Sequence, residues 1–484
     1  MKKNNIYFYI LVIISFLVIS YLLAQKVFQN DTFYTIKVGE SIFKNGIDMK
    51  DHFSFITNLA YTYPHWLYDC FIYFIYSLGG MQFIYISTIV LGFILLFSIY
   101  NFSVKLGYNK YISYIIITVF SFFLSGYFTA RAQMFSYIFF VVILYSLEML
   151  RNTNKKRYLI YLFISSLMIA NMHAAVWLFT FALFLTYIVQ DIIAIIIKKF
   201  DIKIFKSFNI EIEKSKLKIT MIAFGLCLLT GFLTPNFLVP FTYYINTIKG
   251  VSLSHINEHS AITIEGYPYV YFFCFVTLIL LLNKKVKIRL REIFLLVGLF
   301  ILAFSSIKNI SLLIILSMFV YIRLLSSFNL KNIDNSIWYK YFVSVLLLFF
   351  VITFFVSIGV YSKKDYVNEK SYPVEASKFI KENLDYKNIR LFNQYDFGSY
   401  LMYEDIPVFI DSRADLYLKE FNKDCTVFED YFSAKTYYDY YFKKYQITHL
   451  ILKKTTSLYS TIKEKENYKI LYNDDYFVVY ELGD

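Results

Sequence analysis

Seven of the ionisable side chains that stand between the apolar segments of this sequence are candidates for chemistry: Asp31, Asp51, His65, Arg131, His173, Glu258 and Lys308. Carboxylates and imidazoles at such positions can accept or donate protons. A guanidinium or an ammonium group can hold a phosphate. Each residue alone is equally well explained as one that ends a helix at a membrane surface. All seven on one side of a membrane would indicate a site more strongly than any one of them alone.

Asp31 follows the first apolar segment directly, in Asn30-Asp31-Thr32-Phe33-Tyr34. A carboxylate at this place can serve as a general base toward a membrane-embedded substrate. It can equally serve as the N-cap of a following helix, because Asp is a favoured cap. Both roles stay open. Asp51 lies in Asp51-His52-Phe53-Ser54, where a turn is the stronger interpretation.

Arg131 and Lys308 each lie between two apolar segments, and Lys308 is at the tip of a predicted helical hairpin. Their side chains suit a phosphate or pyrophosphate, Arg by bidentate hydrogen bonds and Lys as a point charge. The alternative is that each long side chain extends to lipid headgroups.

Residues 255–259 read His-Ile-Asn-Glu-His and match the H-x-x-E-H pattern of one zinc-protease class. That pattern requires a helix and a distant third ligand, whereas here it falls in a loop and no third ligand stands out. Glu258 is kept as a candidate site carboxylate, and no metal site is assigned. The four cysteines show no C-x-x-C spacing, so neither a disulfide framework nor a thiolate metal site is indicated.

The composition excludes an ordinary soluble enzyme, because 58% of the 484 residues are hydrophobic and only 17% are charged. A membrane-spanning helix needs about 20 apolar residues. Eleven segments qualify: 6–24, 82–104, 111–128, 132–150, 158–172, 174–195, 219–238, 268–283, 292–306, 309–325 and 339–360. We expect a multi-pass protein of the cell membrane.

The net charge of +13 is a topology signal and does not indicate a nucleic-acid partner. Residues 361–484 hold 18 basic and 21 acidic residues, which leaves 30 basic and 14 acidic for residues 1–360. Most of the basic residues before 361 fall in alternate loops, which become cytoplasmic if the N-terminus is cytoplasmic. This places residues 25–81, residues 239–267 and the tail 361–484 on the outer face, together with the seven ionisable residues.

The outer segments carry their own predicted structure. Residues 32–43 and 66–78 predict two interfacial helices. The tail predicts helices at 373–384 and 424–444 and strands at 389–392, 408–410, 448–452, 468–472 and 476–482, which together make a small α/β domain. Residues 409–415 follow a predicted strand and could form a binding site, but we favour an internal ion-pair network of Asp411, Arg413 and Asp415.

Several of these motifs resemble landmarks of GT-C-fold glycosyltransferases, the group that includes dolichyl-phosphate-mannose protein mannosyltransferases and an uncharacterised bacterial branch. The similar segments are residues 31–46, 51–54, 64–67, 131–133, 171–173, 234–236, 308–309, 397–400 and 409–415. The first outer segment lacks an Asp-x-Asp pair and the tail lacks a WWDYG-like segment, so the resemblance does not extend to oligosaccharyltransferase chemistry. Lys308 stands where the resemblance suggests Arg.

The resemblance implies a GT-C-like domain at 1–360, with the outer loop 25–81, and an extracytoplasmic α/β domain at 361–484. It implies inverting transfer of a sugar from a polyprenyl-phosphate donor to an envelope glycan, lipid or protein on the outer face. Asp31 would be the catalytic base, and the other six ionisable residues would bind substrate. No cofactor is assigned and a divalent metal is left open. The alternatives are a transporter or flippase for a lipid-linked saccharide and a non-enzymatic envelope assembly protein.

Overall fold

The computed structural model describes residues 3–200, 210–250, 255–282, 287–327 and 337–483. Lys2 and parts of the basic loops used to predict sidedness, at 201–209, 283–286 and 328–336, lie outside the described residues. The chain divides into two compact units. The first comprises residues 1–25, 85–241 and 256–363, and the second comprises 26–84, 242–255 and 364–484. Residues 26–84, which contain most of the outer loop predicted at 25–81, therefore belong to the same unit as the tail.

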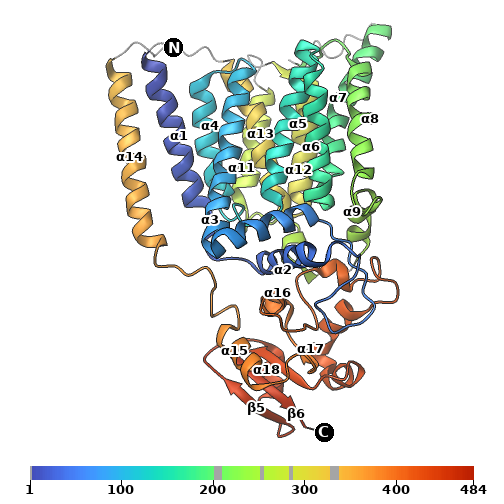
Figure 1. Ribbon diagram of the computed structural model, residues 1–484. Coiled ribbons are helices and arrows are strands. Elements are labelled where there is room, and N and C mark those ends of the chain that lie inside the picture. The colour runs from blue at the N-terminus through green and yellow to red at the C-terminus, as the bar shows by residue number, and fades with distance from the viewer. Residues whose placement is uncertain (1–2, 201–209, 251–254, 283–286, 328–336, 484) are drawn as a thin grey trace. The chain divides into compact units, whose positions relative to one another are not determined.

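The first unit is a bundle of helices (Figure 1). Its helices are α1 (Lys3–Leu23), the second part of α3 (Trp66–Lys105), α4 (Lys110–Ser121), α5 (Gln133–Thr153), α6 (Arg157–Met172), α7 (Phe179–Phe200), α8 (Leu217–Leu229), α11 (Pro268–Leu282), α12 (Leu290–Ser305), α13 (Ile310–Ser326) and α14 (Ile337–Tyr361). Single 3₁₀ turns interrupt it at η1 (Phe122–Leu124), η2 (Ala174–Val176), η4 (Thr230–Phe232), η5 (Asn257–His259) and η6 (Ile307–Asn309). Helix α9 (Val239–Lys249) begins in this unit and continues in the second.

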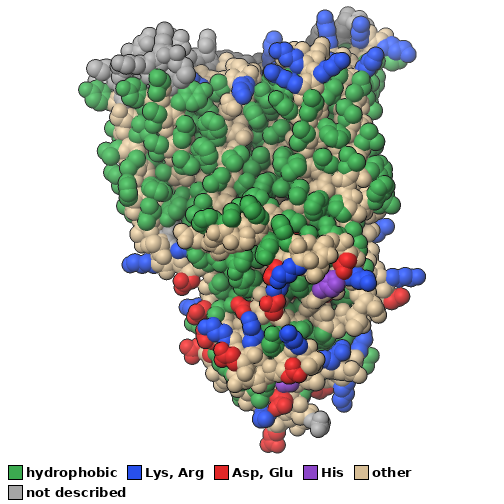
Figure 2. Space-filling view, viewed as in Figure 1, with side chains coloured by type: hydrophobic (Ala, Val, Ile, Leu, Met, Phe, Trp, Pro, Cys, Tyr) green, Lys and Arg blue, Asp and Glu red, His purple; other side chains and the backbone are tan. Residues whose placement is uncertain are grey.

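Every predicted span overlaps a helix of this bundle, but not all of these helices are long enough to cross a membrane. Among the described residues, six helical segments are long and apolar enough to cross a membrane: 6–23, 66–105, 133–153, 174–200, 307–326 and 341–360. Four more are apolar but shorter, at 110–124, 157–172, 217–232 and 268–282. Hydrophobic side chains cover the visible face of the bundle, and Lys and Arg gather at its upper end (Figure 2). The chain is a multi-pass membrane protein, and the predicted sidedness stays a prediction.

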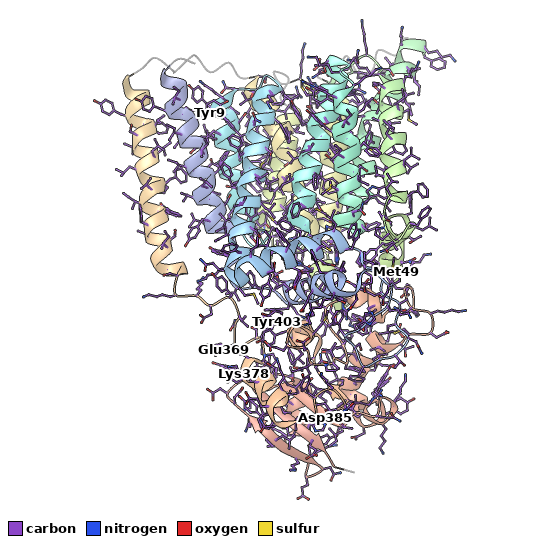
Figure 3. All side chains as sticks on the ribbon, viewed as in Figure 1. Tyr9, Met49, Glu369, Lys378, Asp385 and Tyr403 are labelled. Atoms are coloured by element: carbon purple, nitrogen blue, oxygen red, sulfur yellow. The ribbon has the colours of Figure 1, made fainter. Side chains whose placement is uncertain are left out.

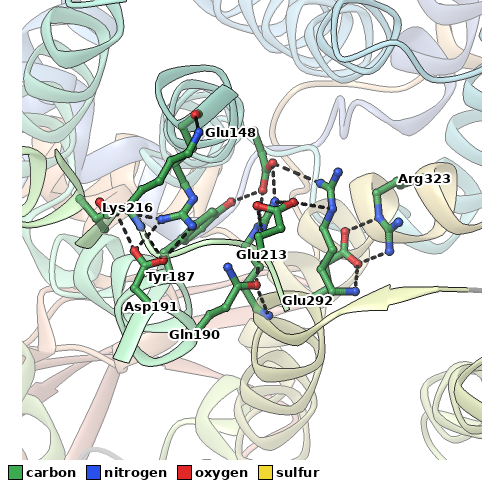
Figure 4. Close-up of polar contacts among 12 residues, drawn as sticks. Glu148, Tyr187, Gln190, Asp191, Glu213, Lys216, Glu292 and Arg323 are labelled. Atoms are coloured by element: carbon green, nitrogen blue, oxygen red, sulfur yellow. Dashed lines mark hydrogen bonds and ion pairs between the residues drawn. The ribbon is translucent and has the colours of Figure 1, made fainter. Parts of the chain in front are cut away.

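Buried ion pairs tie the helices of the bundle together near one end (Figure 4). Arg291 of α12 donates from Nε and Nη2 to Glu148 of α5, at 2.8 and 2.9 Å. Arg151 of α5 pairs with Asp191 of α7 at 2.7 and 2.9 Å, and Arg323 pairs with Glu292. Strands β1 (Ile210–Glu211) and β2 (Ile288–Arg289) pair beside this network. Each of these buried charges has a partner of opposite sign, which offsets the free energy of removing it from water. The pairs fix the register of the helices.

The second unit combines helices with a four-stranded mixed sheet. Its elements are α2 (Asn30–Asn45), the first part of α3, α15 (Val374–Asn383), β3 (Leu391–Phe392), α16 (Tyr395–Tyr403), η7 (Ala414–Tyr417), α17 (Val427–Lys444), β4 (His449–Lys453), α18 (Ser457–Ile462), β5 (Tyr468–Asn473) and β6 (Phe477–Leu482). The strand order is β3-β4-β6-β5, with only the β3 and β4 pair parallel. Helix α3 bends at Gly79 and Gly80, and the φ of +64° at Gly80 favours glycine.

Helix α2 packs against α16 in this unit. Phe33 is fully buried and makes an edge contact with Tyr400 at 5.1 Å between ring centroids. Asn30 Nδ2 donates to the carbonyl of Tyr395 at 2.9 Å. The hydroxyls of Tyr76 and Tyr403 are 2.7 Å apart, and Figure 3 labels Tyr403. These contacts explain why residues 26–84 fold with the tail.

Most predicted elements of the outer segments are confirmed, and one is wrong. Helices α2, α15 and α17 and strands β3 to β6 match the predicted ranges within a few residues. The predicted strand at 408–410 does not join the sheet. Val408 instead pairs with the loop around Ser54, whose Oγ donates to the Val408 carbonyl at 2.9 Å. Helices α16 and α18 were not predicted.

Candidate functional site

The seven candidate residues divide between the two units. Arg131, His173, Glu258 and Lys308 lie in the first unit, and Asp31, Asp51 and His65 lie in the second. Each group is built by its own unit, and the two are described in turn.

Three of the four residues in the first unit belong to one cluster. Arg131 Nη1 lies 3.0 Å from Oε1 and 3.3 Å from Oε2 of Glu258. Lys308 Nζ lies 3.0 Å from Nδ1 of His259. We call Arg131, Glu258, His259 and Lys308 the cationic cluster. His173 is positioned by Ser136, whose Oγ lies 2.8 Å from its Nδ1.

Backbone contacts hold this cluster together. Ser306 Oγ donates to the carbonyl of Glu258 at 2.9 Å, and Ile307 N donates to the carbonyl of Ser260 at 3.1 Å. The turn η5 therefore rests on the tip between α12 and α13, where η6 carries Lys308. This tip is the tight hairpin that the sequence predicted.

The electrostatics of the cationic cluster favour an anion. Burial, together with the positive charges of Lys308 and Arg131, lowers the pKa of His259 to about 4. His259 is therefore neutral at pH 7 and accepts a hydrogen bond from the Lys308 ammonium. Two basic side chains, Arg131 and Lys308, lie beside one carboxylate, Glu258, whose side chain is 51% exposed. A guanidinium and an ammonium group in such a place can bind a phosphate.

In the second unit, Asp31 lies in the first turn of α2 and is not its N-cap. The helix begins at Asn30 and the capping position is Gln29, so the N-cap role considered for Asp31 is wrong. A carboxylate in the first turn still interacts favourably with the helix dipole. Burial raises the pKa of Tyr34, and the negative charge of Asp31 raises it further.

Asp31 belongs to a group of polar residues that we call the acidic cluster: Asp31, Tyr34, His65, Asp69, Tyr243 and Asp415. His65 Nδ1 lies 3.8 Å from Oδ1 of Asp69, one helical turn away. Asp69 is fully buried, and no donor in the described part of the chain lies within hydrogen-bonding distance of its carboxylate. The imidazole of His65 is the basic group that lies beside this carboxylate.

The protonation of the acidic cluster follows from this arrangement. Burial alone would lower the pKa of His65, but the carboxylates of Asp69, Asp415 and Asp31 raise it above its ordinary value. Burial raises the pKa of Asp415, although the positive charges of His65 and Arg413 oppose this shift. Burial and the nearby carboxylate of Asp415 raise the pKa of Tyr243 well above its usual range. The charge of Asp31 contributes to the raised pKa values of Tyr34, His65 and Tyr243.

Asp51 is engaged elsewhere in the second unit. Its Oδ1 accepts from Nη1 of Arg413 at 2.7 Å, and its Oδ2 accepts from the backbone of Ser54 at 2.8 Å. Arg413 also donates to both carboxylate oxygens of Asp411, at 2.9 and 2.7 Å. Of the predicted network of Asp411, Arg413 and Asp415, the pair of Asp411 and Arg413 is present. The second carboxylate paired with Arg413 is Asp51 and not Asp415.

Sequence reasoning missed five residues of these clusters: Tyr34, Asp69, Tyr243, His259 and Asp415. Asp69 stands four residues after His65, a spacing that puts both on one helix face. Asp415 was assigned to the pair network of Arg413. His259 was noticed only as part of the H-x-x-E-H pattern. His255 of that pattern stacks on Phe432 at 4.1 Å between centroids, and no group of three or more His, Cys, Asp or Glu that could hold a metal occurs among the described residues.

An apolar cavity of about 270 Å³ lies within the bundle of the first unit. Helices α5, α7, α12 and α13 line it, mainly with Leu and Phe side chains, and Thr186 is its one polar residue among those described. Gly298 widens it, since nothing lies within 4 Å of where a Cβ would stand. The cavity suits a chain of hydrocarbon.

The chain is a polytopic helical membrane protein, and its fold is similar to that of GT-C glycosyltransferases. Among solved structures, the chain is similar to the Archaeoglobus fulgidus oligosaccharyltransferase, both apo and tethered with an acceptor peptide containing the NVT sequon. The TM-score is 0.57 and the identity 11%, over 100% of this chain and 74 to 75% of that one. It is also similar to ArnT from Cupriavidus metallidurans bound to undecaprenyl phosphate, with a TM-score of 0.53 and 10% identity over 98% of this chain and 97% of that one. No family model and no curated protein matches the sequence. At these identities the similarity shows the fold.

Proposed function

We propose that this protein is a membrane glycosyltransferase that moves a sugar from a polyprenyl-phosphate donor to an acceptor at the outer face of the membrane. The observation that supports this most is the whole-chain similarity in fold to two GT-C enzymes, one of them bound to undecaprenyl phosphate. The branch related to protein mannosyltransferases is part of the proposal.

The cationic cluster is assigned to the carrier phosphate. As the bond between the sugar and the phosphate breaks, negative charge grows on the phosphate oxygens, and fixed cations stabilise that charge. Arg131 supplies a planar pair of donors and Lys308 supplies a point charge. Glu258, which is exposed and holds Arg131 at 3.0 Å, keeps the guanidinium in place before the donor binds. The apolar cavity of about 270 Å³ offers room for part of the carrier chain.

The acidic cluster is assigned to the acceptor. The acceptor hydroxyl attacks the anomeric carbon from the face opposite the phosphate, so that a new carbon–oxygen bond forms as the bond to the carrier phosphate breaks. The hydroxyl proton passes to the Asp31 carboxylate, and the phosphate leaves with the bonding electron pair. His65, held by Asp69, compensates the negative charge of Asp31 and Asp415. No cofactor is required by this step, because the donor supplies its own leaving group.

The test is a change of Asp31 in the living cell. Asp31→Asn removes the base but keeps the size of the side chain, and Asp475→Asn is the matched control at an exposed position between β5 and β6. Mass spectrometry of envelope glycans and lipid-linked sugars should show lost product and accumulated donor for Asp31→Asn alone. Unchanged glycans with normal protein levels would refute the proposal. Donor that accumulates only on the cytoplasmic leaflet in Asp31→Asn, with a normal control, would favour a flippase.

A further inference from the structure

A second cavity of the first unit lies among the ends of α3, α5 and α6, and its lining is unlike that of the apolar cavity. Its volume is about 420 Å³. Lys105 and Arg157 line it together with Phe102 and the tyrosines Tyr145, Tyr158 and Tyr161. We call this cavity the basic pocket. None of these residues belongs to the cationic or the acidic cluster.

The two cations of the basic pocket face no carboxylate. Lys105 and Arg157 are both exposed, and neither forms an ion pair within the described part of the chain. Glu148, the acidic residue of α5 in this region, forms ion pairs with Arg291 and Arg289. The pocket therefore carries two positive charges that no carboxylate among the described residues compensates.

Aromatic side chains fix the wall of the basic pocket. Phe102 and Tyr145 stack with centroids 4.1 Å apart and planes within 8°. Tyr158 is buried, and its hydroxyl accepts from Nη2 of Arg157 at 2.8 Å, which orients the guanidinium. The wall is thus preformed, and Arg157 keeps its remaining donors for a ligand.

The surface next to the pocket is apolar and exposed. On α6, Ile160, Tyr161 and Ile164 are 57%, 44% and 48% exposed. This helix is one of the apolar helices of the bundle. A phosphate that enters the pocket would therefore stand at the end of a helix face that suits acyl chains. A free phosphate has no acyl chain, so contact with that face would not strengthen its binding.

We propose that the basic pocket binds the phosphate headgroup of an anionic phospholipid, with the acyl chains along the exposed face of α6. Basic pockets between membrane helices bind such headgroups. Tyrosines are common at the membrane–water interface, where headgroups lie. The site is separate from the donor site of the proposed function, because its residues lie at the other end of α5 from Arg131.

The test measures lipids retained by the purified full-length protein. Native mass spectrometry compares phosphatidylglycerol with phosphatidylcholine for the wild type, for the double variant Lys105→Gln/Arg157→Gln and for the control Lys198→Gln/Lys199→Gln. The control removes the same charge from exposed positions at the end of α7. We expect roughly 30-fold weaker phosphatidylglycerol binding in the first double variant, as two cations near an anionic surface would give. The control should bind like the wild type.

Three outcomes would overturn the proposal. The first is an equal loss of phosphatidylglycerol binding in both double variants, which would mean that the overall charge of the protein determines binding. The second is no preference of the wild type for phosphatidylglycerol over phosphatidylcholine. The third is displacement of the lipid by millimolar inorganic phosphate, which would make free phosphate the ligand. Thermal unfolding of both variants checks folding, and an unfolded double variant is replaced by the single change Lys105→Gln, for which we expect roughly 5-fold weaker binding.

Discussion

Arg413 Nη1 donates to Asp51 Oδ1 at 2.7 Å, which joins two residues 362 positions apart in the sequence. Both side chains are only 1% exposed. The guanidinium also lies over the rings of Phe53 and Tyr61, at 5.2 and 4.9 Å from their centroids. This contact fixes the loop after α2 to the tail, and the acidic cluster takes residues from both segments.

Removal of Arg413 should strongly destabilise the second unit. Arg413→Met leaves two buried carboxylates, Asp411 and Asp51, without a cation, and breaking such a buried pair costs about 3–5 kcal/mol. Thermal unfolding of the purified protein should show a clear fall in Tm. Lys381→Met is the control, because the pair of Lys381 with Glu404 is partly exposed and contributes about 1 kcal/mol or less. Equal effects of the two changes would contradict this account.

The stability of the second unit should fall as the pH rises above neutral. The pKa of His65 is raised in the folded protein, so its contribution is fully present below the unfolded pKa of about 6.5. It is lost as the pH rises through the folded value. Tm measured from pH 6 to 9 should therefore decline in the wild type and decline less in His65→Gln. Parallel curves for the two proteins would show that His65 is not the group responsible.

Gly398 should tolerate no side chain. A Cβ at this position of α16 would lie 2.0 Å from the carbonyl oxygen of Ile410. Gly398→Ala should therefore destabilise the second unit by about 1–3 kcal/mol, as overpacking does. Gly225→Ala is the control, since nothing lies within 4 Å of a Cβ there. A Tm equal to that of the control would show that α16 and the loop after Val408 can move apart.

The sequence predicted the helices of the bundle well, because long apolar segments can satisfy their backbone in a bilayer only as helices. It also predicted the hairpin that carries Lys308 and the pairing of Arg413 with Asp411. It did not predict that residues 26–84 fold with the tail. Helix α2 buries Phe33 against α16, and a contact between segments so far apart leaves no local pattern.

Only part of each cluster could be predicted, because contacts between segments far apart in the sequence leave no local pattern. Arg131, Glu258 and Lys308 proved to share one cluster, although they come from three segments. Asp69 and Asp415 were missed, because only the folded chain brings their charges near His65. Val408 was predicted as a strand from its apolar neighbours, yet its partner is a loop residue.

Binding of the carrier phosphate should be coupled to a proton. Burial and the positive charges of Lys308 and Arg131 together lower the pKa of His259 to about 4, and a phosphate between Arg131 and Lys308 would offset those charges. His259 would then gain a proton more easily, so binding of undecaprenyl phosphate should strengthen as the pH falls from 7.5 to 5.5. His259→Gln should lose this gain, and comparison with it removes the titration of the phosphate itself. Lys363→Gln, at an exposed position after α14, should behave like the wild type.

The central claim is that Asp31 accepts the proton during transfer of a sugar from a polyprenyl-phosphate donor. The most direct measurement is the release of undecaprenyl phosphate from a panel of labelled undecaprenyl-phosphate hexoses and pentoses by the reconstituted protein, with envelope extract as acceptor. The account predicts release by the wild type and by Asp475→Asn, and roughly 100-fold slower release by Asp31→Asn, the usual effect of losing a general base. Equal release by wild type and Asp31→Asn, or none by the wild type from any donor, would contradict it.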